Sequence, residues 1–193
     1  QQHRCQTVQF DAAVFTNLSR DHLDYHADMA GYAAAKRLLF TDYAPSFAII
    51  NNDDSYGKKW FGELNGGMQM LSFGLQEGAE LTAKILSVNI DGMNLRITGP
   101  WGSEEVHTSL LGAFNASNLL AAAGTLALLG MPWHRVLHQL EVMQAVPGRM
   151  MRLGGQAGQP VVVVDYAHTP DALESALHAV RAHLDGRLVC VFG

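Results

Sequence analysis

Two histidines and two carboxylates lie close together in residues 21–26, Asp-His-Leu-Asp-Tyr-His. His22 and His26 are four residues apart, so they would share one face of a helical turn. Carboxylates and imidazoles are both metal ligands, and hard cations such as Mg²⁺ prefer oxygen. The segment therefore predicts a metal site. A helix N-terminus with capping acids is an alternative explanation that needs no metal.

Lys36 follows this segment in the sequence Tyr-Ala-Ala-Ala-Lys. It shares helical spacing with Tyr32 and Phe40, which places it on the apolar face of a predicted helix. A lysine there can pack its aliphatic stem while its amine extends to water. A functional amine near the acidic cluster, chemically modified, is the other interpretation.

Short apolar runs predict the strands that would position these residues. Residues 12–15 end just before the histidine cluster, and open α/β sheets bind ligands at the carboxyl ends of their strands. Residues 47–50 and 68–73 predict two more strands. Between residues 81 and 111, short alternating runs predict three strands and a small antiparallel sheet beside the main one.

A nearly all-apolar, buried helix is predicted over residues 119–129, and Asn115 and Asn118 precede it three residues apart. Helix capping explains one asparagine well. Two amides on one helical face also suggest a polar ligand. A second helix is expected over residues 132–144.

The last part of the chain predicts a new domain. Arg149 follows a Pro-Gly turn, and glycine-rich residues 154–160 predict a linker. The four valines of residues 161–164 are typical of a parallel strand covered on both faces, with Asp165 at its carboxyl end. A helix starting at Thr169 and a strand over residues 188–192 would complete a right-handed βαβ unit. We therefore expect domains at residues 1–153 and 154–193.

Composition narrows the classes of function. The net charge of −5 argues against a nucleic-acid partner, which favours basic surfaces. No apolar run reaches the roughly 18 residues of a membrane span, so no membrane insertion is expected. The two cysteines form neither a disulfide framework nor a zinc motif, which indicates a reducing cytoplasm.

These segments together resemble the Mur ligases, the ATP-dependent amide-forming enzymes of peptidoglycan precursor synthesis. The resemblance implies an α/β fold with a mostly parallel sheet and flanking helices, an incomplete P-loop-type central domain, and the start of a Rossmann-like C-terminal domain. The matching segments occur in the family's order. They are Gln2-His3-Arg4, residues 21–26 with Lys36, the asparagine pair, Gly148-Arg149-Met150, and residues 165–171, Asp-Tyr-Ala-His-Thr-Pro-Asp.

The resemblance also implies roles for the catalytic and substrate-binding residues. In the family, the lysine matching Lys36 carries a carbamate, and the histidine matching His22 ligates Mg²⁺. Gln2 and Arg4 match residues that contact a UDP-linked muramoyl dipeptide, although the serines that precede them in the family are absent here.

ATP would bind at four further positions. The asparagines matching Asn115 and Asn118 lie near the adenine in the family. The arginine matching Arg149 contacts the phosphates, and the aspartate matching Asp165 meets the ribose.

The sequence departs from the family at several points. Phe114 stands where relatives often have histidine, and Met151 replaces a glutamate. No Gly-x-x-x-x-Gly-Lys-Ser/Thr phosphate loop occurs in the chain, although the family carries one. We therefore expect an internal fragment of a longer protein, inactive by itself. A monomer is expected separately from this observation.

The implied substrates are ATP, UDP-MurNAc-L-Ala-D-Glu and a diamino acid, with diaminopimelate favoured over lysine. Three alternatives stay open. A folylpolyglutamate-type ligase would share the domain plan with another substrate. A metal-dependent hydrolase could use Asp21, His22, Asp24 and His26 without ATP. The third alternative is a binding module without catalytic activity.

Overall fold

The computed structural model describes residues 7–19, 26, 28–64, 67–156 and 158–192. Four sequence predictions fall outside this range. The substrate-binding residues Gln2 and Arg4, the metal ligand His22 and most of the acidic cluster therefore stay predictions from sequence.

One six-stranded mixed sheet forms the centre of the fold, with its strands in sequence order. The first four strands pair in parallel, whereas the fifth strand pairs in antiparallel with both the fourth and the sixth. The strands are β1 (Ala12–Phe15), β2 (Phe47–Asn51), β3 (Gln69–Gly74), β4 (Leu81–Asn89), β5 (Gly92–Gly99) and β6 (Gly102–Thr108).

The alternating strands do not form a separate sheet, which corrects the sequence prediction. β4 pairs in parallel with the end of β3, where Phe73 lies opposite Leu81. It then pairs in antiparallel with β5 along most of its length. Because β4 makes both pairings, β5 and β6 extend the main sheet.

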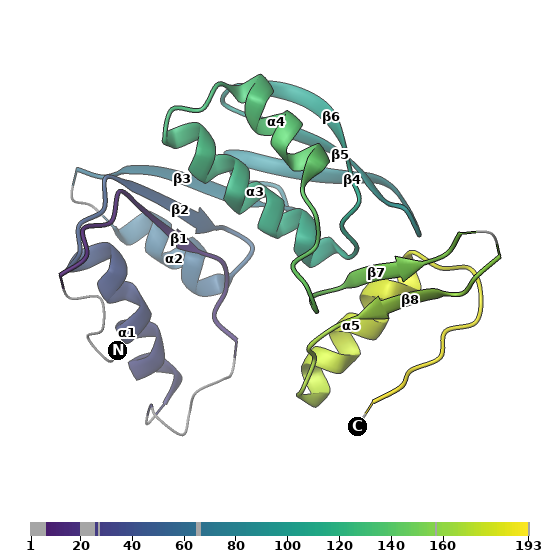
Figure 1. Cartoon of the computed structure of the whole chain (residues 1–193). Helices are drawn as coiled ribbons and strands as arrows, with labels where there is room; N and C mark the ends of the chain where they lie inside the picture. The colour runs from purple at the N-terminus through teal and green to yellow at the C-terminus, as the bar shows by residue number, and fades with distance from the viewer. Residues whose placement is uncertain (1–6, 20–25, 27, 65–66, 157, 193) are drawn as a thin grey trace.

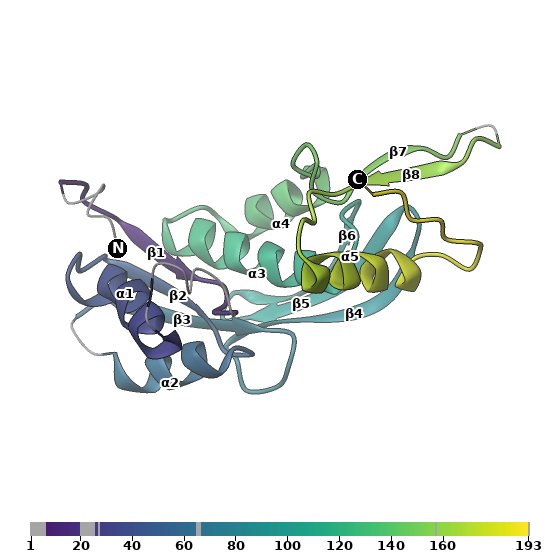
Figure 2. The ribbon, with the colours of Figure 1, turned by 90° about the horizontal axis from the view of Figure 1, so that it is seen from below.

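Helices cover both faces of this sheet (Figures 1 and 2). α1 (Met29–Thr41) and α2 (Ser55–Glu63) lie on one face, and α3 (Ala113–Leu128) and α4 (Trp133–Val142) lie on the other. Side chains on β2 alternate between the two cores: Ala48 and Ile50 pack toward α1 and α2, and Ile49 packs toward α3. β2 is therefore buried on both sides, as its apolar run predicts.

The C-terminal part is a hairpin followed by a helix. β7 (Met151–Gly154) and β8 (Val161–Val164) pair in antiparallel, and α5 (Pro170–Ala182) follows them. Within the glycine-rich stretch predicted as a linker, Gly154 ends β7, and residues 155–156 and 158–160 lie between β7 and β8. The four valines are not a parallel strand covered on both faces, because β8 pairs with β7 and leaves Val162 and Val164 exposed.

Thr169 caps α5 by accepting a hydrogen bond from the Ala172 N–H, with Pro170 in the first turn, as predicted. The second strand of the expected βαβ unit is absent. Residues 188–192 contain no strand, and Val191 and Phe192 are exposed. An apolar run forms a strand only where a neighbour accepts its backbone hydrogen bonds, and none of the described strands lies beside it.

Polar side chains at the end of β2 hold the carboxyl ends of three strands together. The Asn51 side chain donates to the Thr16 carbonyl after β1, at 2.6 Å. The Asp53 carboxylate accepts from the Leu75 and Gln76 N–H groups after β3. Residues 51–54 therefore cap and turn the chain at this edge of the sheet.

Asp54 should contribute most to stability in this group. Its carboxylate accepts from Leu18 N, Tyr56 N and Gly57 N, so it caps α2 and holds the chain after β1. Asp54→Ala removes the cap and leaves a partly buried N–H without its partner. We expect a loss of about 2–4 kcal/mol in the free energy of unfolding, measured by urea denaturation. Glu77→Ala, an exposed acid in the turn after β3, should change it by less than about 0.5 kcal/mol. Equal effects of the two substitutions would contradict this prediction.

Candidate nucleotide pocket and lysine site

Lys36 lies half-buried on the inner side of α1, as the helical spacing predicts. Its Nζ is 5.0 Å from the centroid of the Tyr32 ring. The Tyr32 ring in turn stacks on His26, with centroids 5.0 Å apart. The lysine amine is therefore held beside an aromatic pair rather than extended freely into solvent.

Asp28 is the N-cap of α1, and its Oδ1 accepts from the Gly31 N–H at 2.8 Å. Capping at this helix end thus uses an acid outside residues 21–26. Among the described residues, no group of three or more His, Cys, Asp or Glu side chains could hold a metal ion. An unmodified Lys36 amine would repel a cation, and only a carbamate on it would supply oxygen ligands.

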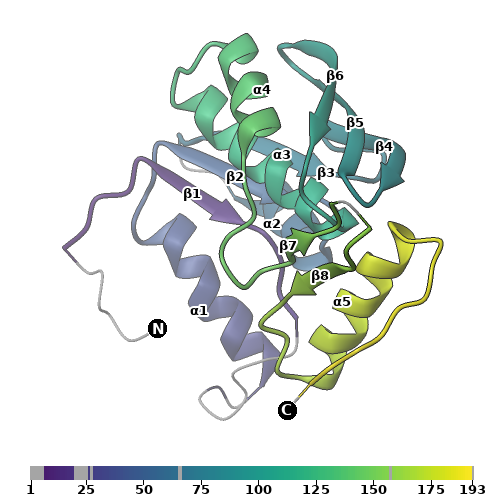
Figure 3. The same cartoon turned by 45° about the vertical axis from the view of Figure 1, so that its right-hand side comes forward.

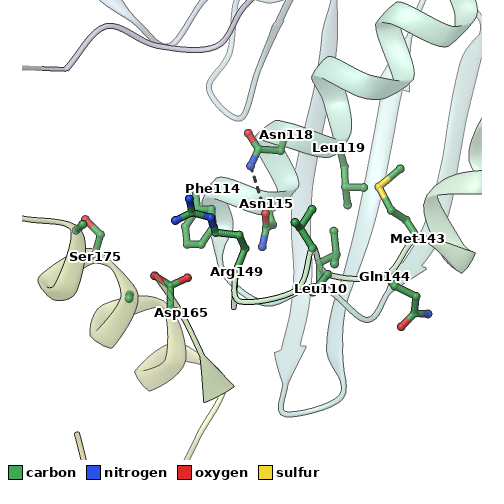
Figure 4. Close-up of a pocket in the computed structure, with 14 residues that line it drawn as sticks. Leu110, Phe114, Asn115, Asn118, Leu119, Met143, Gln144, Arg149, Asp165 and Ser175 are labelled. Atoms are coloured by element: carbon green, nitrogen blue, oxygen red, sulfur yellow. Dashed lines mark hydrogen bonds between the residues drawn. The ribbon is translucent and has the colours of Figure 1, made fainter. Parts of the chain in front are cut away.

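The N-terminal end of α3 faces the turn before β7 and the C-terminal helix α5 (Figure 3). A pocket of about 470 Å³ opens between these elements (Figure 4). This volume suits a small-molecule ligand. Its lining residues are Leu110, Phe114, Asn115, Asn118, Leu119, Met143, Gln144, Ala145, Val146, Arg149, Asp165, Ala172, Ser175 and Ala176.

All four residues predicted to bind ATP lie in this one pocket. Asn115 and Asn118 come from α3, Arg149 from the turn before β7, and Asp165 from the end of β8 (Figure 4). They are up to 50 residues apart in the chain. Only tertiary folding brings them together. Lys36 does not line this pocket.

Neither asparagine caps α3, which has no side-chain cap at its N-terminus. The Asn115 side chain donates to the Leu111 carbonyl at 2.8 Å. Asn118 donates to the Asn115 Oδ1 at 3.2 Å. Capping therefore does not explain the pair, and the amides instead form a short chain along the pocket wall. This arrangement favours the predicted polar ligand.

Arg149 and Asp165 are positioned by the same short segment. The Arg149 guanidinium lies 4.7 Å from the centroid of the exposed Tyr166 ring. The next residue, Met150, is buried and has a φ of +46°, which non-glycine residues rarely adopt. Its N–H donates to Asp165 Oδ2 at 2.9 Å. This bond and the buried Met150 side chain stabilise the unusual turn and fix Arg149 at the pocket.

Part of the pocket wall was not predicted from the sequence. Ala172, Ser175 and Ala176 of α5 line it, and small side chains at this helical spacing were the available signal. Phe114, noted only as a departure from the family, is 43% exposed and also lines the pocket. Met151, the other departure, begins β7 opposite Val164.

Comparison with known proteins shows the protein family to which the chain belongs. Residues 1–126 match the Mur ligase middle domain, and residues 148–193 match the Mur ligase, glutamate ligase domain. The first match alone covers more than half of the chain, so the chain belongs to the Mur ligase family.

Within this family, the chain is similar to UDP-N-acetylmuramoyl-L-alanyl-D-glutamate--2,6-diaminopimelate ligases. It is 46% identical over 194 residues to the one from Xanthomonas campestris pv. campestris (strain 8004), covering 100% of this chain and 39% of the relative. The Coxiella burnetii ligase is 43% identical over 197 residues, covering 100% and 40%. A solved structure of a ligase with the same name is 32% identical, with a TM-score of 0.80, over 94% of this chain and 38% of that one. The chain thus spans about two fifths of the length of these relatives.

Proposed function

We propose that this chain is part of an ATP-dependent ligase that adds meso-diaminopimelate to UDP-MurNAc-L-Ala-D-Glu. The observation that carries this proposal is the pocket that gathers Asn115, Asn118, Arg149 and Asp165. The names of the similar ligases support the choice of substrates.

The pocket offers a complementary group for each part of ATP. Leu110, Leu119 and Met143 form an apolar wall for the adenine ring, and the asparagine amides can bond its polar edge. Asp165 uses one oxygen for the Met150 N–H, and its carboxylate can also accept from ribose hydroxyls. Arg149 supplies the positive charge for the phosphates.

The proposed reaction has two steps. The γ-phosphoryl group of ATP passes to the side-chain carboxylate of D-glutamate and gives an acyl phosphate and ADP. The amine of the diamino acid then attacks the acyl carbon, an amide forms, and phosphate leaves. Such transfers depend on positioning and on neutralising oxygens rather than on a protein nucleophile.

The metal site rests on the family resemblance. His22 and carbamylated Lys36 would hold Mg²⁺, which would neutralise charge on the transferred phosphate. Lys36 is half-buried on α1. Gln2 and Arg4 would contact the UDP-linked substrate.

The domain boundary, the oligomeric state and the cellular location also stay predictions. We propose that the central domain ends near residue 153, that the protein is a monomer, and that it acts in the cytoplasm. The described part of the chain contains no helix both long and apolar enough to cross a membrane.

ADP release by the complete ligase that carries this sequence tests the function. The assay contains ATP, Mg²⁺ and UDP-MurNAc-L-Ala-D-Glu, with diaminopimelate in one series and lysine in the other. We expect release only when the UDP-linked peptide and diaminopimelate are both present. Release in the lysine series but not in the diaminopimelate series would identify a ligase of different specificity. Metal-dependent hydrolysis without ATP would favour the hydrolase instead. The 193 residues by themselves should show no turnover.

A further inference from the structure

His183 connects two parts of the chain that flank the nucleotide pocket. It lies at the C-terminal end of α5 and is 5% exposed. Its Nε2 is 2.9 Å from the Gly112 N, and its Nδ1 is 2.6 Å from the Asn89 carbonyl oxygen. Both partners belong to the large sheet domain, 71 and 94 residues away in sequence.

The two bonds define the protonation of the ring. A carbonyl oxygen can only accept, so Nδ1 carries the proton and donates to Asn89. A backbone N–H can only donate, so Nε2 is unprotonated and accepts from Gly112. The imidazole is therefore neutral, with both nitrogens used.

The bond with His183 satisfies the backbone N–H of the N-cap residue of α3, at the helix end that bears the asparagines. Gly112 is the N-cap residue, it is buried, and α3 has no side-chain cap. Its N–H would be unsatisfied without His183, which is costly for a buried donor. α5 also packs closely here. A Cβ on Gly112 would lie 3.0 Å from the Ala179 Cβ, at a φ of +89°.

A short relay leads from this bond to the pocket. The Gly112 carbonyl accepts from the Asn115 N–H at 2.9 Å. The preceding Leu111 carbonyl accepts from the Asn115 side chain, and that side chain accepts from Asn118. The backbone around Gly112 thus orients both amides.

We propose that His183 is a positioning residue that orients Asn115 and Asn118 for the nucleotide through its bond to Gly112. This inference rests on the proposed function, because it takes the pocket to bind ATP. A purely structural histidine would stabilise the fold and leave nucleotide affinity unchanged.

Two substitutions separate the two bonds. Glutamine places its Oε1 where Nε2 lies, so His183→Gln can still accept from Gly112 and loses the donor to Asn89. Asparagine places its Nδ2 where Nδ1 lies, so His183→Asn can still donate to Asn89 and loses the acceptor for Gly112. The Arg152–Asp91 ion pair, at 2.9 Å, still ties β7 to the turn after Asn89 in both variants.

The test is the Kd for ADP with Mg²⁺, measured by calorimetry on the complete ligase well below the Tm of each variant. We expect His183→Asn to raise the Kd about tenfold and His183→Gln to stay within about twofold of the parent. The KM for the UDP-linked substrate should be unchanged in both. His178→Asn, at an exposed position of α5, is the matched control and should bind as the parent does.

Three results would overturn the inference. An unchanged Kd in His183→Asn, with only a lower Tm, would make His183 merely structural and leave the proposed function standing. An equal rise in both His183 variants would show that the Gly112 bond is not the cause. Failure of the parent ligase to bind ADP would remove the proposed function and this inference together.

Discussion

Lys36→Ala in the complete ligase is expected to lower kcat by at least about 10²–10³-fold. As a carbamate, Lys36 would supply the negatively charged oxygens that hold Mg²⁺ at the reacting phosphate. Alanine removes this charge and cannot be modified. The fold should survive, because Tyr32 and Phe40 on the same face of α1 provide the buried packing. Steady-state ADP release and thermal unfolding measure the two effects separately.

Added short carboxylic acids should restore part of the activity of Lys36→Ala, because a free carboxylate can occupy the space of the carbamate. Lys58→Ala is the matched control, since Lys58 is exposed on α2. It should have the parent kcat with or without added acid. Full activity of Lys36→Ala would show that Lys36 only packs its stem against α1. Absence of rescue at any acid concentration would count against the carbamate.

Arg149→Ala should lower kcat/KM for ATP by about 10²–10³-fold, because a guanidinium fixed at the pocket can stabilise charge that develops on the phosphates. Arg149→Lys should recover only a small part of this loss. An ammonium cannot bond phosphate oxygens in the same forked geometry, nor lie as a plane over the Tyr166 ring. Steady-state kinetics at varied ATP concentration measure both variants.

Tyr166→Phe is the matched control for Arg149, because phenylalanine retains the aromatic face 4.7 Å from the guanidinium. It should have kinetics close to those of the parent. If Arg149→Ala kept the parent kcat/KM for ATP, the arginine would be a solvated turn residue, and the assignment of the phosphate end of the pocket would be wrong.

Local patterns in the sequence predicted the secondary structure of the central part well. Apolar runs predicted β1, β2 and β3, and helical spacing placed Lys36 correctly on the inner side of α1. Thr169 and Pro170 predicted the start of α5. Such features depend on neighbouring residues, so sequence alone determines them. The chemically distinctive residues of the pocket could be named for the same reason.

Pairing between distant segments could not be predicted from these patterns. The four valines of β8 suit a parallel strand as well as a hairpin, and only the presence of β7 beside them decided the outcome. The same holds for β4, whose contact with β3 joins the antiparallel strands to the main sheet. Residues 188–192 have a strand-like sequence, but none of the described strands pairs with them.

The sequence by itself determined the family, the strands β1 to β3, the start of α5, and the identity of Asn115, Asn118, Arg149 and Asp165 as binding residues to be tested. Only the tertiary structure decided that these four line one pocket, that α5 closes its side, and that His183 holds the start of α3. The physical reason is the range of the contacts. A hydrogen bond across 71 residues leaves no periodic trace in the sequence, because it depends on how whole elements pack rather than on the residues next to either partner.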